Sequence, residues 1–205
     1  SGGVFGLTGE MGLGVLFPPG GGDGKIEGIP SPSVREEGRR KVSMALASVV
    51  STLVNAYAGS VVSVSQTLGV EAVFQKTEIA TGVNAPGSRV AALIGIVGAG
   101  LHGTAALMAD MEGFSIYVKA LTGGMIEANP EDPMSMSVLG ELTNMTSGQA
   151  LMKVDLPGLD ITPPQLITGD NIKAVPPRKA DVKSFTLPFQ VGGQGRIYLV
   201  LSFHE

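Results

Sequence analysis

The sequence predicts an α+β fold in which helices pack on one face of a largely antiparallel sheet. Apolar residues recur at helical spacing from Met44 to Leu68, and short apolar or alternating segments separated by glycine-rich turns follow. Near the end of the chain SFTLPFQV and GRIYLVLSF flank Gly192-Gly193, which is the pattern of a β-hairpin. The chain has 205 residues, 43% of them hydrophobic, which is enough for one domain with a substantial core.

The elements follow in the order helix, strands, two helices, strands. After the helix at 44–68 we expect strands at 72–79, 89–97 and 104–108, helices at 114–121 and 134–152, and strands at 160–161, 165–167, 184–191 and 195–203. Pro188 predicts that its strand is an edge strand or carries a bulge, because proline cannot donate a ladder hydrogen bond.

Composition argues against several classes of protein. The chain has no cysteine and two histidines, so we expect no disulfide framework, no bound metal and no cofactor. Its net charge of −4, without a large Lys/Arg cluster, argues against a nucleic acid partner. The apolar run at 90–101 is well short of the roughly 20 residues that cross a bilayer. We therefore expect a cytoplasmic protein without a transmembrane segment or a membrane partner.

Residues 1–43 differ in composition from the rest of the chain. Twelve of the 30 glycines lie in the first forty residues, together with four prolines. The stretch lacks the basic start and the unbroken apolar centre of a signal peptide. We expect a Gly/Pro-rich leader, an expression remnant or upstream sequence at 1–43, and a compact domain at 44–205.

Two familiar motifs are better explained by structure than by catalysis. Gly98-x-Gly100-x-x-Gly103 follows an apolar strand, but the helix and the repeating βαβ pattern of a dinucleotide site do not follow it. We expect a hairpin turn at these glycines. His102 and His204 occur without a G-x-S-x-G motif, so we expect surface histidines and not a nucleophilic triad.

The helix at 134–152 has two unlike sides. Asp132 can cap its start, and Pro133 suits its first turn. At about 100° per residue, one side gathers Val138, Leu139, Leu142, Met145 and Met152, and the other gathers Ser137, Glu141, Asn144 and Gly148. Gly140 and Gly148 cost roughly 1 kcal/mol each relative to alanine, which a closely approaching partner would explain. By themselves Glu141 and Asn144 are typical of a solvated helix face, and we expect Met134, Met136, Met145 and Met152 to fill the core.

The string Ser137-x-x-x-Glu141-x-x-Asn144-x-x-x-Gly148 resembles the signature of the CheC/CheX/FliY chemotaxis phosphatases. The similarity covers about residues 50–205, from Asn55-Ala56-Tyr57 through the predicted hairpin at 90–108 to the C-terminal hairpin. One Glu/Asn pair is present, as in the CheX members of this family, whereas CheC-type members usually carry two. Residues 1–43 have no counterpart in the family.

The resemblance implies a CheC/CheX-like fold and hydrolysis of the aspartyl phosphate on a phosphorylated CheY-type response regulator. Asn144 would hold the attacking water in line with phosphorus, and Glu141 would pair with a lysine of the regulator. Ser137, Gly140 and Gly148 would form the contact surface for this partner. The divalent ion, Mg²⁺, would be bound by the regulator and not by this chain. The CheX members also imply a homodimer.

Two rival functions stay open at the level of the sequence. A non-catalytic docking domain on the same fold would bind a response regulator or a flagellar-switch component, with Glu141 and Asn144 as contact residues only. A small-molecule hydrolase has no nucleophile or metal constellation in its favour. The decay rate of a phosphorylated regulator distinguishes the phosphatase from the docking domain.

Overall fold

The computed structural model describes residues 32–98, 100–154, 156–170, 172 and 182–204. The chain divides into two units, Ser1–Arg39 and Arg40–Glu205, and the described strands lie in the second. In chain order the elements are α1 (Pro32–Thr67), β1 (Ala72–Phe74), the short 3-10 helix η1 (Lys76–Glu78), β2 (Ala80–Thr81), β3 (Val90–Gly98), β4 (Leu101–Ala109), α2 (Met111–Thr122), α3 (Pro133–Lys153), β5 (Asp160–Ile161), β6 (Gln165–Thr168), β7 (Val182–Val191) and β8 (Gly195–His204).

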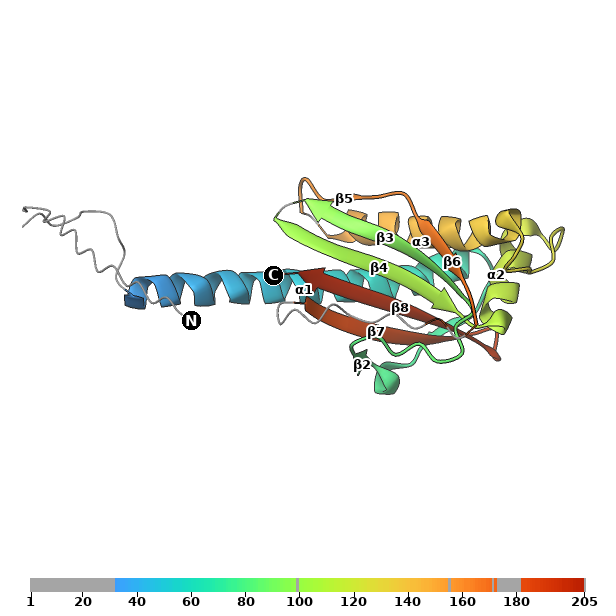
Figure 1. The fold of residues 1–205 in the computed structure, drawn as a ribbon, viewed down its shortest axis with the longest axis horizontal. Coiled ribbons are helices and arrows are strands. Elements are labelled where there is room, and N and C mark those ends of the chain that lie inside the picture. Colours follow the sequence, from blue (N-terminus) through green and yellow to red (C-terminus); the bar gives the residue numbers. More distant parts are fainter. Residues whose placement is uncertain (1–31, 99, 155, 171, 173–181, 205) are drawn as a thin grey trace, which may run out of the picture. The chain divides into compact units, whose positions relative to one another are not determined.

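The strands form one sheet with the order β1-β7-β8-β4-β3-β5, in which β2 also pairs with β7 and β6 also pairs with β3. Every pairing is antiparallel. The two long hairpins, β3–β4 and β7–β8, form the centre of the sheet and join through β4 and β8 (Figure 1). The predicted α+β fold with a largely antiparallel sheet is confirmed.

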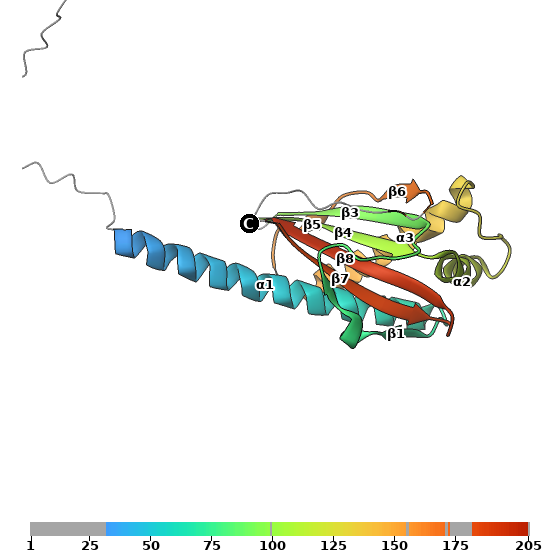
Figure 2. The ribbon, with the colours of Figure 1, turned by 60° about the horizontal axis from the view of Figure 1, so that its bottom comes forward.

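The main core lies between one face of the sheet and the three helices. Each helix contributes large, fully buried side chains: Leu53 and Tyr57 from α1, Phe114 and Tyr117 from α2, and Leu139 and Leu142 from α3. They pack against the inward-facing residues of the central strands, and Figures 1 and 2 show α1 and α3 on the same side of the sheet. The opposite face of the sheet carries a much smaller cluster around Met108, Tyr198 and Val200. The helices are therefore on one face, as predicted.

The first helix begins earlier than the sequence predicts. α1 starts at Pro32, on the N-terminal side of the expected start at Met44. The additional turns contain Glu, Arg and Lys, which are good helix formers but show no apolar periodicity, and proline is favoured in a first turn. Residues 1–31 of the predicted leader lie outside the described residues.

α1 also contains a stretch, Ala47–Thr67, that is long and apolar enough to cross a membrane by length and composition alone. Length and composition do not show that this stretch spans a membrane, so the absence of a transmembrane segment stays a prediction. Of its most apolar 18-residue window, a share of 39% is buried inside the structure. The buried residues include Leu53, Tyr57, Val61 and Val64, which belong to the main core cluster. This stretch is thus also the core helix of the domain.

The strand predicted at 72–79 is interrupted by η1, which leaves β1 and β2 on either side of a gap in the pairing with β7. The backbone N–H of Gln75 donates to the carbonyl of Pro188 at 2.9 Å. In a strand the nitrogen and carbonyl of one residue point to the same side, so the proline nitrogen faces this gap. The prediction of an edge strand or a bulge at Pro188 is wrong, because β7 lies inside the sheet with unbroken register to β8.

Both glycine-marked turns are hairpin turns, as predicted. Gly98 pairs with Leu101 at the end of β3–β4, and Gly98 and Gly100 have φ angles of 113° and 75°. Side chains strain such left-handed backbone, which explains the glycine fingerprint without a nucleotide. His102 follows this turn and is exposed.

Two buried tyrosines connect α1 to the other helices. The Tyr117 hydroxyl on α2 lies 2.5 Å from Ser65 Oγ on α1, and burial raises the pKa of Tyr117 to about 12. Burial also raises the pKa of Tyr57 to about 12. The Ser147 hydroxyl on α3 is close enough to lower the pKa of Tyr57 to a smaller extent, although the two hydroxyls do not meet in good hydrogen-bond geometry. Both tyrosines therefore stay protonated in the folded domain at neutral pH.

We expect the domain to lose stability between about pH 10 and pH 12, because tyrosine ionises near 10 when the chain is unfolded. A folded-state pKa above the unfolded value contributes stability that is complete below pH 10 and disappears as the pH rises through the folded value. For Tyr57 and Tyr117 the contribution is at most roughly 3 kcal/mol each. Urea unfolding measured from pH 8 to 12 checks this, and Tyr117→Phe should flatten the alkaline decline. A free energy of unfolding that is constant above pH 10 would contradict it.

Candidate functional site

α3 is fixed at both ends by hydrogen bonds. Asp132 caps the helix by accepting a bond from the backbone N–H of Ser135 at 2.8 Å, and Pro133 occupies the first turn. The Ser135 hydroxyl accepts a bond from the backbone N–H of Asn129 at 3.0 Å, which ties the preceding segment to the helix. At the other end the Val154 N–H donates to the Leu151 carbonyl at 3.1 Å. The predicted helix is confirmed and extends from Pro133 to Lys153.

The inner side of α3 is buried against the sheet and the other helices. Val138, Leu139 and Leu142 are buried as predicted, and Met145 is half-buried. This side is less apolar than the helical periodicity predicts, because four polar residues are buried there as well: Ser135, Thr143, Thr146 and Ser147. Thr143 satisfies its hydroxyl by donating to the Leu139 carbonyl at 2.7 Å. Since α3 is packed in this way along its length, its outer side is held in one orientation.

One flank of α3 is covered by the segment that joins β5 to β6. A Cβ built on Gly140 would lie 3.2 Å from Cδ2 of Leu166, the second residue of β6, and 3.4 Å from Pro164 Cγ, so a larger residue would require these side chains to shift by a few tenths of an ångström. The segment is anchored to β3, because the Gly95 N–H donates to Thr162 Oγ1 at 2.8 Å. The prediction that Gly140 contacts a partner is wrong, because Gly140 is buried inside the chain. Its role is to bring the edge of the sheet against α3.

The outer side of α3 presents the remaining predicted residues together. We call Ser137, Glu141, Asn144 and Gly148 the polar strip. The first three are exposed and Gly148 is half-buried. The Ser137 hydroxyl donates to the Met134 carbonyl at 2.7 Å. Within the part of the chain that the structure describes, the side chains of Glu141 and Asn144 form no hydrogen bond or ion pair. A carboxylate and a carboxamide one turn apart are thus both available to an incoming molecule.

Gly148 differs from Gly140 in its surroundings. A Cβ built on Gly148 would meet no atom within 4 Å, so nothing in the described chain requires glycine at this position. A glycine inside a helix costs roughly 1 kcal/mol relative to alanine. The open space over Gly148 is adjacent to Asn144 on the same strip.

Two methionines expected in the core are exposed instead. Met134 is 65% exposed and Met152 is 81% exposed, so the core assignment is wrong for both, whereas Met136 is buried. Both lie near the ends of the helix, where its neighbours no longer cover it. The spacing 134, 137, 141, 144, 148, 152 in steps of three or four places both methionines in line with the polar strip. The sequence therefore indicates that both methionines lie along the strip, whereas their exposure depends on where the elements packed against α3 end.

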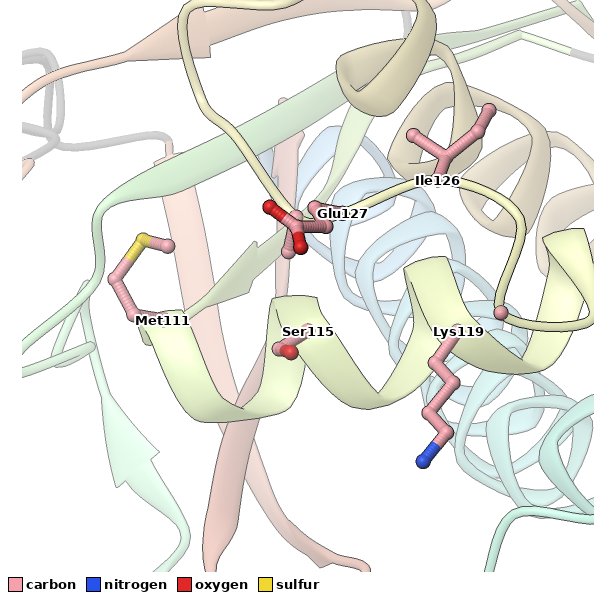
Figure 3. A pocket seen from close by; sticks show the side chains of 7 residues that line it. Met111, Ser115, Lys119, Ile126 and Glu127 are labelled. Carbon is pink, nitrogen blue, oxygen red and sulfur yellow. The ribbon is translucent and has the colours of Figure 1, made fainter.

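A hollow of about 400 Å³ lies elsewhere, between α2 and the segment that leads to α3. Ser115 and Lys119 of α2 and Glu127 of that segment line it, and in Figure 3 the Lys119 ammonium points away from the Glu127 carboxylate. None of the residues of the polar strip lines this hollow. Over the residues that the structure describes, no group of three or more His, Asp or Glu side chains is placed to hold a metal ion. The polar strip is therefore the best-defined candidate site.

Comparison with known proteins assigns the chain to a family. The family model described as "Chemotaxis phosphatase CheX" matches residues 90–190, which include the β3–β4 hairpin and all of α3. A relative from Thermotoga maritima, named "CheY-P phosphatase CheX", is 37% identical over 124 residues. The match covers 59% of this chain and 78% of the relative.

Solved structures share the fold. The chemotaxis protein CheX from Vibrio vulnificus superposes with a TM-score of 0.61 at 22% identity, covering 74% of this chain and 99% of that one. CheX from Borrelia burgdorferi, solved in a complex described as CheX-CheY-BeF3-Mg, superposes with a TM-score of 0.57 at 20% identity, covering 74% and 97%. From the sequence match and the shared fold together, this chain belongs to the CheX family of chemotaxis phosphatases.

Proposed function

We propose that this protein hydrolyses the aspartyl phosphate of a phosphorylated CheY-type response regulator. The observation that carries the proposal is the polar strip: Glu141 and Asn144 are exposed, one turn apart and uncommitted on a helix whose other side is buried. Family membership supports it, since a relative at 37% identity is named a CheY-P phosphatase. The Borrelia burgdorferi structure, in which a protein of this fold is complexed with CheY, supports the choice of partner.

Phosphoryl transfer makes modest demands on the phosphatase. The reaction depends mainly on placing the nucleophile in line with the bond that breaks and on stabilising the charge on phosphorus. The Asn144 carboxamide has both a donor and acceptors, so it can hold a water molecule in line with phosphorus. That water attacks, the bond from phosphorus to the aspartyl oxygen breaks, and inorganic phosphate and the free carboxylate result. No nucleophile from this chain is consumed.

Glu141 would serve recognition. Apart from Lys153 at the end of the helix, it is the only charged residue of α3, and it can form a charge-assisted hydrogen bond with a lysine of the regulator. Such a pair one turn from Asn144 would set the register of α3 across the phosphorylation site. We propose that the divalent ion, Mg²⁺, belongs to the regulator and that this chain binds no cofactor of its own.

Replacing the two residues separately should give different kinetic effects. Asn144→Ala should lower kcat by about a hundredfold or more, because positioning of the reacting water is lost. Glu141→Ala should raise KM by about tenfold and change kcat little, because it removes binding energy that is present before the reaction. Loss of radioactive phosphate from a CheY-type regulator, followed at several regulator concentrations, separates the two constants.

Matched controls are available on other surfaces of the domain. Asn84→Ala and Glu71→Ala remove exposed side chains of the same two types away from α3 and should leave both constants unchanged. If the wild-type protein binds the regulator but does not accelerate its dephosphorylation, the docking-domain alternative is correct. If Asn144→Ala retains full turnover, the proposed role of the carboxamide is wrong.

Substitution of Gly148 tests whether the regulator approaches α3 closely, without destabilising the fold. Gly148→Ala should stabilise α3 by roughly 1 kcal/mol, since its Cβ would project into empty space. The same methyl group should obstruct a partner seated over Asn144, so KM should rise although the melting temperature rises too. A variant with higher stability and unaltered KM would show that the partner does not approach this position.

We also propose that residues 44–205 form the phosphatase domain and that residues 1–43 are dispensable for catalysis. The described core residues of α1 begin at Val50, which supports this boundary. Deletion of residues 1–43 should leave kcat and KM within about twofold and lower the free energy of unfolding by less than about 1 kcal/mol, because no described core contact is lost. Circular dichroism melting and the dephosphorylation assay check both, and a truncated protein that melts early or is inactive would move the boundary.

We also propose that the protein is a homodimer, because β6 is an edge strand of four exposed residues that pairs, among the described strands, with β3 alone. An open strand edge is a natural place for a second chain to pair.

We further propose that the protein is cytoplasmic, since the apolar residues of α1 that are described as buried face the domain core.

A further inference from the structure

We propose that Met134 and Met152 are the apolar contacts that seat the phosphorylated response regulator on α3, one at each end of the polar strip. This inference rests on the proposed function. It adds that the regulator has apolar surface on either side of the region that the polar strip binds. Met134 is 65% exposed and Met152 is 81% exposed, so each presents most of its side chain to solvent. Single exposed apolar residues are ordinary on protein surfaces. Two of them in line with a polar strip require an explanation.

The helical positions place these methionines on the side of Asn144. At about 100° per residue, Met134, Ser137, Glu141, Asn144, Gly148 and Met152 fall within a sector of roughly 80°. A rise of about 1.5 Å per residue separates Met134 from Met152 by about 27 Å. A standard interface of about 800 Å² per partner has a diameter of roughly 30 Å. One regulator centred on Glu141 and Asn144 therefore reaches both methionines.

Methionine suits this position chemically. Its flexible, polarisable side chain adapts to the surface it meets, which is why it is common on binding surfaces that accept related partners. Apolar contacts at both ends of the strip would add binding energy that is present in the bound complex before the reaction and in its transition state alike. Between the two methionines Glu141 is the one charged residue of α3. A regulator surface that is complementary to α3 would therefore have a lysine opposite Glu141 and apolar side chains on either side of the phosphorylated aspartate.

Glutamine substitutions test this without disturbing the helix. Met and Gln have similar length and helix propensity, so Met134→Gln and Met152→Gln change polarity with little effect on folding. The double variant should raise KM for the phosphorylated regulator about tenfold, and each single variant about threefold, with kcat unchanged. The dissociation constant for the regulator charged with beryllofluoride should rise by the same factors. Met134→Leu/Met152→Leu, which keeps the apolar surface, should restore both values to within about twofold of wild type.

Met125 provides a matched control. It is 86% exposed but belongs to the segment between α2 and α3 and not to α3 itself, so we expect Met125→Gln to leave KM unchanged. An unchanged KM in the double glutamine variant would overturn the inference, and so would a fall in kcat alone. If Met125→Gln weakened binding as much as the double variant does, a general loss of surface apolarity would explain the effect, and the inference would fail. The proposed function would survive all three results, provided that the wild type accelerates dephosphorylation and Asn144→Ala does not.

Discussion

Packing of α3 on its inner side and on one flank is the constraint on which the site depends. The inner side is buried in the core, and the flank at Gly140 is covered by Pro164 and Leu166 from the edge of the sheet. A helix held along two surfaces can neither rotate nor slide without losing buried contacts, and densely packed interiors tolerate little displacement. The side chains of Glu141 and Asn144 are therefore presented in a fixed register, although neither is bonded to another described residue.

This arrangement separates the structural and functional duties of one helix. Residues such as Leu139 and Leu142 hold α3 in the domain, while on the outer side the side chains of Glu141 and Asn144 form no hydrogen bond or ion pair with the described part of the chain. A preorganised site loses little conformational freedom on binding, which favours both affinity and correct placement of a reacting water. The two glycines illustrate the division. Gly140 permits contact within the chain, and Gly148 leaves space outside it.

Local signals in the sequence are sufficient to predict most of the helices and strands. Asp132 and Pro133 marked the start of α3, glycines with positive φ marked the hairpin turns, and the spacing of Glu141 and Asn144 placed both on the outer side. Features that depend on distant segments could not be read in this way. Burial of Gly140 depends on where the segment after β5 crosses α3, and the exposure of Met152 depends on where the neighbours of α3 stop. The break between β1 and β2 accommodates a proline more than a hundred residues later in the chain.

The position of the strip on the surface of a helix also bears on selectivity. A helix is a convex ridge, and a convex surface has no walls with which to enclose a small phosphate ester. Phosphorylated metabolites would meet here one carboxylate and one amide, which is too little to hold them against water. A folded protein that carries its own phosphate could complete what the ridge lacks by adding contacts around it. Discrimination between the two kinds of phosphate thus follows from the shape of α3, before any particular contact is considered.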